Sequence, residues 1–173
     1  MLTTIIFNFL KDILDENIDR YTDPHPRHYK NRRIRMSIRQ NKAIVCRFIN
    51  EAYNKRNLNV GDELLAANVV LHVSNSEIKG LDSWKQYAGS FLAGFSEIVI
   101  SVKETIAEGD KVVANWICHG IQTGEIQDIA PTDKLVTWTG IAIYRFGDGK
   151  IEEVWVWNDI WGMMRQLGVI PSG

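Results

Sequence analysis

The stretch IVISVKETIAEGDKVVANWICHG, residues 98–120, decides the fold, because apolar residues recur at every second position along both of its halves. The alternation runs from Ile98 and starts again at Val112, with Gly109 in the turn between them. A period of two is typical of β-strands, and a glycine-containing turn between two such segments predicts a hairpin. This hairpin is the centre from which the rest of the chain can be interpreted.

The same alternation continues toward the C-terminus. It predicts strands at 136–146 and 151–158, and Gly147-Asp148-Gly149 joins them into a second hairpin. A terminal helix is predicted at 161–167. The second half of the chain is therefore expected to form a meander of long antiparallel strands.

The residues before the meander show helical spacing instead. Apolar side chains recur every three or four positions at 43–53 and again at 84–92, which predicts two amphipathic helices. A short helix at 61–66 and a brief strand at 69–73 are expected between them. Helices followed by a meander predict the α+β class. We expect a strongly curved sheet to wrap against the helices and leave a cone-shaped cavity between the two layers.

Residues 1–35 differ from the rest of the chain in pattern. Ile6, Phe9 and Ile13 belong to an apolar stripe, which predicts one amphipathic helix, and a proline- and arginine-rich linker follows it. The folded domain is expected to span 36–173. Because an isolated helix of this length is marginal in water, we expect the extension to pack on its own domain or on a partner chain.

Charge and composition limit the partners that the protein can have. The net charge is −1, so a nucleic-acid partner is not expected, and the basic run between 27 and 39 is interpreted as a solvated face. No apolar stretch approaches the ~20 residues needed to span a bilayer, so no membrane partner is expected. Cys46 and Cys118 have neither metal-ligand nor disulfide spacing, and both are expected to be reduced. A cytoplasmic protein follows from these features.

The last predicted strand carries the residues that matter most for chemistry. Glu153, Trp155, Trp157 and Asp159 share one face at a period of two. A carboxylate among aromatic rings is desolvated and favours its protonated form, so Asp159 could exchange protons near neutral pH. The alternative is that Asp159 caps the terminal helix, since aspartate is a favoured N-cap residue. The spacing favours the cap, and the two roles are compatible.

Two histidines in the folded part are further candidates for proton transfer. His119 and His72 each lie at the end of a predicted strand, and either could act with Asp159 if the fold brings them together. A lone strand histidine is more often structural, and that interpretation is favoured for both. The six tryptophans supply the usual lining of a small-molecule pocket.

Several chemistries lack their sequence motifs. The chain has no glycine-rich phosphate loop, no HExxH pair, no G-x-S-x-G nucleophile elbow and no clustered Cys/His metal site. We therefore expect neither a metal nor an organic cofactor. What remains is acid/base chemistry on a bound, reactive substrate, or ligand binding without turnover.

A set of short motifs occurs along the chain in a recognisable order. They are Gly94-Phe95-Ser96-Glu97-Ile98, Ile106-Ala107-Glu108-Gly109-Asp110, Thr123-Gly124-Glu125, Ala130-Pro131-Thr132, Thr139-Gly140-Ile141, Gly149-Lys150-Ile151 and Gln166-Leu167-Gly168, together with Glu153, Trp155 and Asp159. In this order they resemble the SnoaL-like polyketide cyclases, or ester cyclases, of the NTF2-like superfamily. Each motif is weak by itself, but the resemblance runs from Ile44 to Gly168.

The resemblance implies an NTF2-like, cone-shaped α+β barrel with N-terminal helices packed on a curved antiparallel sheet, and usually a homodimer. It also implies that an aspartate in the position of Asp159 acts as general acid/base in an intramolecular aldol ring closure of a polyketide ester, without metal or organic cofactor. The family's G-T-H-x-G motif corresponds here to Gly120-Ile121-Gln122-Thr123-Gly124, so Gln122 replaces a histidine. Glutamine forms hydrogen bonds but cannot carry a proton at neutral pH. Pro131-Thr132-Asp133 replaces the usual P-T-G.

The predicted site combines catalytic and substrate-binding residues. The catalytic candidates are Asp159, His119 and His72, and the substrate-binding candidates are Trp155, Trp157, Glu153, Gln122, Trp116, Trp138 and Phe91. The expected ligand is a small, apolar, carbonyl-bearing molecule. The main alternative is a ligand-binding or dimerisation module without turnover.

Two other enzymes of this fold are disfavoured. An epoxide hydrolase arrangement needs an aspartate two positions from an arginine, but Arg145 has Ile143 and Gly147 there. An isomerase needs a tyrosine/acid pair that the sequence does not place.

Overall fold

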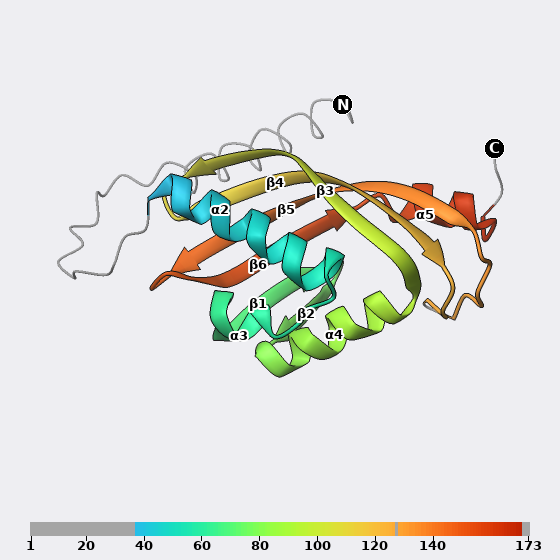
Figure 1. Cartoon of the computed structure of the whole chain (residues 1–173), viewed down its shortest axis with the longest axis horizontal. Helices are drawn as coiled ribbons and strands as arrows, with labels where there is room; N and C mark the ends of the chain where they lie inside the picture. The colour runs from blue at the N-terminus through green and yellow to red at the C-terminus, as the bar shows by residue number, and fades with distance from the viewer. Residues whose placement is uncertain (1–36, 127, 171–173) are drawn as a thin grey trace, which may run out of the picture. The chain divides into compact units, whose positions relative to one another are not determined.

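The computed structural model describes residues 37–126 and 128–170. The extension predicted at 1–35 lies outside these residues. The helices are α2 (Ile38–Ile49), the π-helical turn η1 (Asn50–Asn54), α3 (Val60–Leu64), α4 (Leu81–Ala93) and α5 (Ile160–Leu167). The strands are β1 (Leu65–Val73), β2 (Ser76–Lys79), β3 (Phe95–Glu108), β4 (Lys111–Gln122), β5 (Leu135–Gly147) and β6 (Lys150–Asn158). The predicted α+β class is confirmed, and β2 is the one strand among the described residues that the pattern missed (Figure 1).

The six strands form one sheet in the order β2-β1-β6-β5-β4-β3. Strands β3 to β6 make the predicted antiparallel meander. Strand β1 departs from the expected antiparallel arrangement, because it runs parallel to β6, with Val73 opposite Val156. Strands β2 to β5 and helix α4 separate β1 from β6 in the sequence, so no tight turn dictates their relative direction.

Irregularities in β3 bend the sheet. The register of β3 against β4 shifts between Ser96 and Val99 and again between Val102 and Glu104. Glu97, inside the first shift, has a φ of 50°. A β-bulge bends its strand and increases the local twist. In Figure 1, α2 crosses in front of the strands and α4 lies below them.

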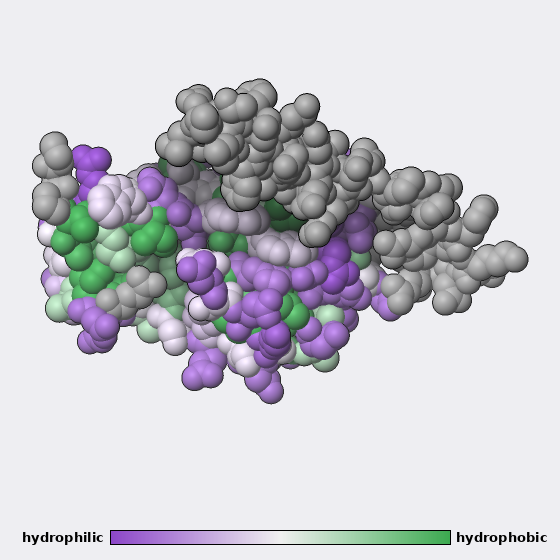
Figure 2. Space-filling view, turned by 180° about the vertical axis from the view of Figure 1, so that it is seen from behind, coloured by the Kyte–Doolittle hydropathy of each residue, from purple (hydrophilic) through white to green (hydrophobic). Residues whose placement is uncertain are grey.

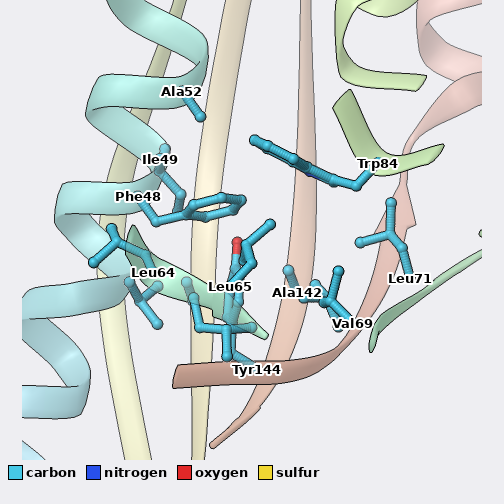
Figure 3. Close-up of a cluster of buried hydrophobic side chains, with 14 of the residues drawn as sticks. Phe48, Ile49, Ala52, Leu64, Leu65, Val69, Leu71, Trp84, Ala142 and Tyr144 are labelled. Atoms are coloured by element: carbon cyan, nitrogen blue, oxygen red, sulfur yellow. The ribbon is translucent and has the colours of Figure 1, made fainter. Parts of the chain in front are cut away.

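Aromatic side chains join the helices to the inner face of the sheet. Phe48 of α2 packs against Trp84 of α4 and Tyr144 of β5, with ring centroids 5.5 Å and 6.2 Å apart (Figure 3). All three side chains are buried. Burial of such side chains contributes roughly 2–3 kcal/mol each, so this cluster fixes the helices on the sheet.

Polar side chains from the first helical segment cover the outer edge of β3. Asn54 donates to the Ile100 carbonyl at 3.0 Å and accepts from the Ile100 N–H at 2.7 Å. Lys42 donates to the Thr105 carbonyl at 2.7 Å. These contacts satisfy backbone groups that a sheet edge would otherwise leave open.

Candidate functional site

A cavity of about 350 Å³ lies between the inner face of the sheet and helices α4 and α5. Its lining is mostly apolar and comes from η1, α4, α5 and the strands of the sheet. It comprises Tyr53, Val73, Ser74, Tyr87, Phe91, Phe95, Ile100, Trp116, Cys118, Ile126, Trp138, Val156, Asn158, Ile160 and Met163. A concave apolar site with a few polar groups is the usual form of a small-molecule pocket.

Aromatic rings form one continuous wall of this pocket. The Phe95 ring lies 5.5 Å from Phe91 and 5.1 Å from Trp138, and Tyr53 meets Phe91 edge-on at 6.2 Å. Because each ring is held by its neighbours, the wall is preformed rather than assembled around a ligand. The structure therefore brings Phe91 and Trp138, two of the predicted substrate-binding residues, into the pocket lining.

Trp116 also lines the pocket, and Gly140 makes room for it. A side-chain carbon at Gly140 would lie 2.2 Å from Cζ2 of Trp116 and 2.7 Å from the carbonyl oxygen of Trp157. Strand register aligns Trp116 with Gly140 and Gly140 with Asn158, across β4, β5 and β6. The glycine thus lets the indole lie over β5 in the row that ends at Asn158.

The polar groups of the lining are neutral at physiological pH. Burial raises the pKa of the Cys118 thiol to about 12. Burial also raises the pKa of Tyr53, with a smaller contribution from nearby Tyr87, and it raises the pKa of Tyr87 itself. Among the described residues, the lining contains no aspartate, glutamate, histidine, lysine or arginine. The interior of the pocket can therefore offer hydrogen bonds but no ionised acid or base.

Asp159 lies next to the pocket lining but is not part of it. Its Oδ1 accepts a hydrogen bond from the Gly162 N–H at 2.8 Å, which confirms that Asp159 is the N-cap of α5. The side chain is exposed, so the desolvation invoked from the sequence is absent. Its neighbours in the chain, Asn158 and Ile160, both line the pocket, and Asp159 therefore stands at its rim.

The structure corrects the predicted orientation of the last strand. Ile151 and Val154 are both buried, so the alternation slips within β6 beside the register shift between Arg145 and Phe146. Beyond that slip, Val156 and Asn158 face the pocket, whereas Trp157 is 56% exposed. Periodicity separates the two faces of a strand but does not say which one faces the pocket. Neither Trp155 nor Trp157, both expected there from the sequence, lines the pocket.

Glu153 and Trp155 belong to a polar network outside the pocket. His72 stacks on Trp155 with ring centroids 5.1 Å apart, and its Nε2 lies 2.8 Å from Glu153 Oε1. Arg145 Nε donates to Glu153 Oε2 at 2.8 Å. Partial burial alone would raise the pKa of Glu153, but the hydrogen bonds from His72 and Arg145 outweigh it and lower that pKa. Figure 2 views the molecule from behind Figure 1 and shows hydrophobic residues gathered at the left end and mostly hydrophilic residues over the centre.

The remaining predicted residues have structural positions. Nδ1 of His119 lies 2.8 Å from Thr137 Oγ1, and neither His119 nor His72 lines the pocket. Each catalytic candidate has a different partner, because Asp159 bonds the Gly162 N–H, His119 meets Thr137 and His72 meets Glu153. Gln122 is fully buried, but its amide holds the loop at 123–134 rather than a ligand. Its Nε2 donates to the carbonyls of Gly124 and Ala130 at 2.8 Å and 3.0 Å, and its Oε1 accepts from the Thr132 N–H at 2.8 Å.

Sequence reasoning missed several polar residues of the lining. Tyr53 and Tyr87 lie in helices that the sequence predicts, but the predicted site includes neither of them. Ser74 follows β1 in a turn that was not predicted. Asn158 alternates with Trp157 along β6 and therefore lies on the opposite face of the strand. This alternation is the sequence signal that could have identified Asn158.

No helix is long and apolar enough to span a membrane in the part of the chain that the structure describes. Within 37–126 and 128–170, no cluster of three or more His, Cys, Asp or Glu side chains could hold a metal ion.

Comparison with known proteins identifies relatives of this chain. Residues 43–167 match the family model described as SnoaL-like polyketide cyclase. The nogalonic acid methyl ester cyclase of Streptomyces nogalater is 32% identical over 90 residues, which cover 51% of this chain and 67% of that protein. The aklanonic acid methyl ester cyclase of Streptomyces galilaeus is 32% identical over 108 residues, 62% of each chain. The match to the latter protein thus spans less than two thirds of its length.

Solved structures with lower identity share the fold. TsrD from Streptomyces laurentii has a TM-score of 0.72 at 22% identity, over 78% of this chain and 99% of that one. A SnoaL-like polyketide cyclase from Agrobacterium tumefaciens has a TM-score of 0.64 at 16% identity, over 74% of this chain and 98% of that one.

Gly140 and Gln166, both in motifs noted in the sequence, have structural roles here. Gly140 makes room for Trp116, and Gln166 forms hydrogen bonds with the backbone N–H and carbonyl of Thr137.

Proposed function

Because the chain belongs to the SnoaL-like polyketide cyclase family, we propose that it binds a small, apolar, carbonyl-bearing compound in the pocket and that Asp159 moves a proton at the pocket rim. The proposed reaction is a ring closure, as the names of the methyl ester cyclases indicate for those relatives. The aldol type is what the family resemblance implies. The proposal has two separable parts, binding and proton transfer.

The lining of the pocket is the observation that carries the binding part. Phe91, Phe95 and Trp138 form an aromatic wall, and a cavity of about 350 Å³ has room for a fused-ring compound of moderate size. An ionised ligand group would meet no opposite charge among the described lining residues, and its burial would be costly. The lining therefore favours a neutral ligand.

The position of Asp159 supports the proton-transfer part. A carboxylate can remove a proton from the carbon next to a carbonyl, which gives an enolate. The enolate carbon then bonds to a second carbonyl carbon of the same molecule, and the resulting alkoxide takes the proton back from the carboxylic acid. No atom is gained or lost overall. Gly162 suits this arrangement, because a side-chain carbon there would lie 2.1 Å from Asp159 Oδ2.

Proton exchange on a simple ketone tests the catalytic part without knowledge of the substrate. The α-protons of 2-tetralone exchange in D2O, and NMR follows their loss. We expect the wild-type protein to accelerate this exchange and Asp159→Asn to abolish the acceleration. Asparagine caps helices as well as aspartate does, so this variant removes the acid/base group and keeps the cap. Acceleration of equal size in both proteins would rule out a role for Asp159.

A pair of tryptophan variants tests the binding part. Trp138 lines the pocket and Trp157 lies on the outer face. Trp138→Leu should weaken the binding of fluoren-9-one roughly tenfold, because an aromatic contact and its buried area are lost. Trp157→Leu is the matched control and should leave the affinity unchanged. Equal affinities in both variants and the wild type would refute this pocket as the binding site.

Binding without turnover is the second candidate function. It is favoured by the absence of an ionised side chain among the described lining residues. Tight binding of fluoren-9-one together with no acceleration of 2-tetralone exchange would select this function over the first.

The family resemblance implies a homodimer, and we propose that the outer face of the sheet forms its interface. Ile141 and Trp157 are register partners on that face, and they are 46% and 56% exposed. Light scattering should give twice the chain mass for the wild-type protein and the single mass for Trp157→Glu. A monomeric wild-type protein would overturn this part.

A further inference from the structure

We propose that Asn158 binds a carbonyl oxygen of the ligand and holds the adjacent carbon beside Asp159. This inference rests on the proposed function, because it takes the pocket as the ligand site. It adds a specific residue whose chemical role follows from its surroundings.

The first observation is that Asn158 has unused hydrogen-bonding capacity. It lines the pocket and is half-buried. Its main chain pairs with Gly140 across β5 and β6. Its side-chain amide makes no hydrogen bond with any residue in 37–126 or 128–170. A ligand that fills the pocket would displace water from this half-buried amide, so a ligand oxygen at this place would replace the hydrogen bonds that the amide loses.

The second observation concerns the neighbours of Asn158. Gly140 separates it from Trp116 in the strand register, and the Trp116 ring lies over that glycine. A flat ligand that contacts Trp116 can therefore reach the Asn158 amide with no β5 side chain in the way. The next residue, Asp159, stands at the rim of the pocket. The order Trp116, Asn158, Asp159 thus offers an aromatic contact, a hydrogen-bond donor and a proton acceptor.

The third observation sets Asn158 apart from the other polar group at this edge. Strands β1 and β6 run parallel with Val73 opposite Val156, so Ser74 and Asn158 lie at the same end of the sheet. Ser74 is exposed, whereas Asn158 is half-buried. A hydrogen bond from Ser74 competes with water more directly than one from Asn158. Asn158 is therefore the better donor for a bound carbonyl.

A matched pair of probes isolates this hydrogen bond. Fluoren-9-one and fluorene have the same ring system and differ by one carbonyl oxygen. We expect Asn158→Leu to lose roughly fivefold in affinity for fluoren-9-one, the usual size for one neutral hydrogen bond, with no change for fluorene. Asn158→Asp keeps the shape of the side chain but loses both donors, and it should show the same selective loss. Ser74→Ala removes the other polar group at this edge and should lose less affinity for fluoren-9-one than either Asn158 variant.

The outcomes separate this inference from the function on which it rests. Wild-type protein that binds neither probe would overturn both. Binding of both probes with equal losses in the Asn158 variants, or with no losses, would overturn this inference and leave the pocket as a binding site. A selective loss of fluoren-9-one in Ser74→Ala instead of the Asn158 variants would also overturn it. Thermal melts that match the wild type establish that each variant is folded.

Discussion

Replacement of Gln122 by leucine should destabilise the protein strongly, although the two side chains have similar volumes. Gln122 is fully buried, and its amide bonds the carbonyls of Gly124 and Ala130 and both the N–H and the hydroxyl of Thr132. Leucine would remove all of these hydrogen bonds. Gly124 and Thr132 are half-buried and Ala130 is exposed, so water can replace part of the lost bonding. At about 1 kcal/mol net for each hydrogen bond lost, the free energy of unfolding should fall by about 3 kcal/mol.

Urea denaturation followed by tryptophan fluorescence measures this loss. A small domain has a total stability of about 5–15 kcal/mol, so a loss of this size shifts the midpoint clearly. Gln122→His is the informative control, because histidine offers one donor and one acceptor and occupies this position in the family motif. It should lie between the wild type and Gln122→Leu. A loss below about 1 kcal/mol for Gln122→Leu would refute the argument that this amide holds the loop.

Three further predictions concern other side chains. Asp159→Ala should lower the free energy of unfolding, measured in urea, by about 1 kcal/mol, because the Gly162 N–H loses its capping partner. Asp159→Asn keeps a capping side chain and should lower it far less. Equal losses in the two variants would contradict the role of Asp159 as a helix cap. The pKa of Glu153 is lowered from 4.5, so its interactions stabilise the fold above that pH and are lost as the pH falls through the lowered value. Glu153→Gln should therefore lose less thermal stability than the wild type when the pH is lowered from about 5 to about 3, roughly the range in which carboxylates titrate. An unchanged dependence of the melting temperature on pH would refute this. Burial raises the pKa of Cys118 to about 12, so iodoacetamide should modify the exposed Cys46 first in the native protein. Mass spectrometry of the digested protein measures both rates, and equally fast modification of Cys118 would contradict its burial.

The sequence was sufficient for the strands of the meander because local physics determines them. Alternation and glycine turns depend on residues close in the chain, and the predicted hairpins around Gly109 and Gly149 are confirmed. The parallel pairing of β1 with β6 depends on contacts between distant segments. No local pattern contains that information, so the direction of β1 was not predictable.

The candidate site shows the same division. Phe91, Trp116 and Trp138 were named from the sequence, and the structure places them in the lining. Which face of β6 is inside depends on a register slip near Glu152 and on the packing of the helices, and neither has a local signature. Asn158 was overlooked for this reason. Gln122 was recognised as unusual, but its partners could be seen only once the loop at 123–134 was folded back on it.

The contacts of Asn54 and Lys42 with β3 have a consequence for the behaviour of the protein at high concentration. An open strand edge can recruit strands from other molecules and start ordered aggregates. Here the edge strand is 14 residues long, and the side chains from α2 and η1 occupy its backbone groups at Ile100 and Thr105. The opposite edge is β2, which has four residues. A sheet whose long edge is partly occupied and whose other edge is short is a poor template for strand addition, so we expect the folded domain to resist fibril growth at its edges.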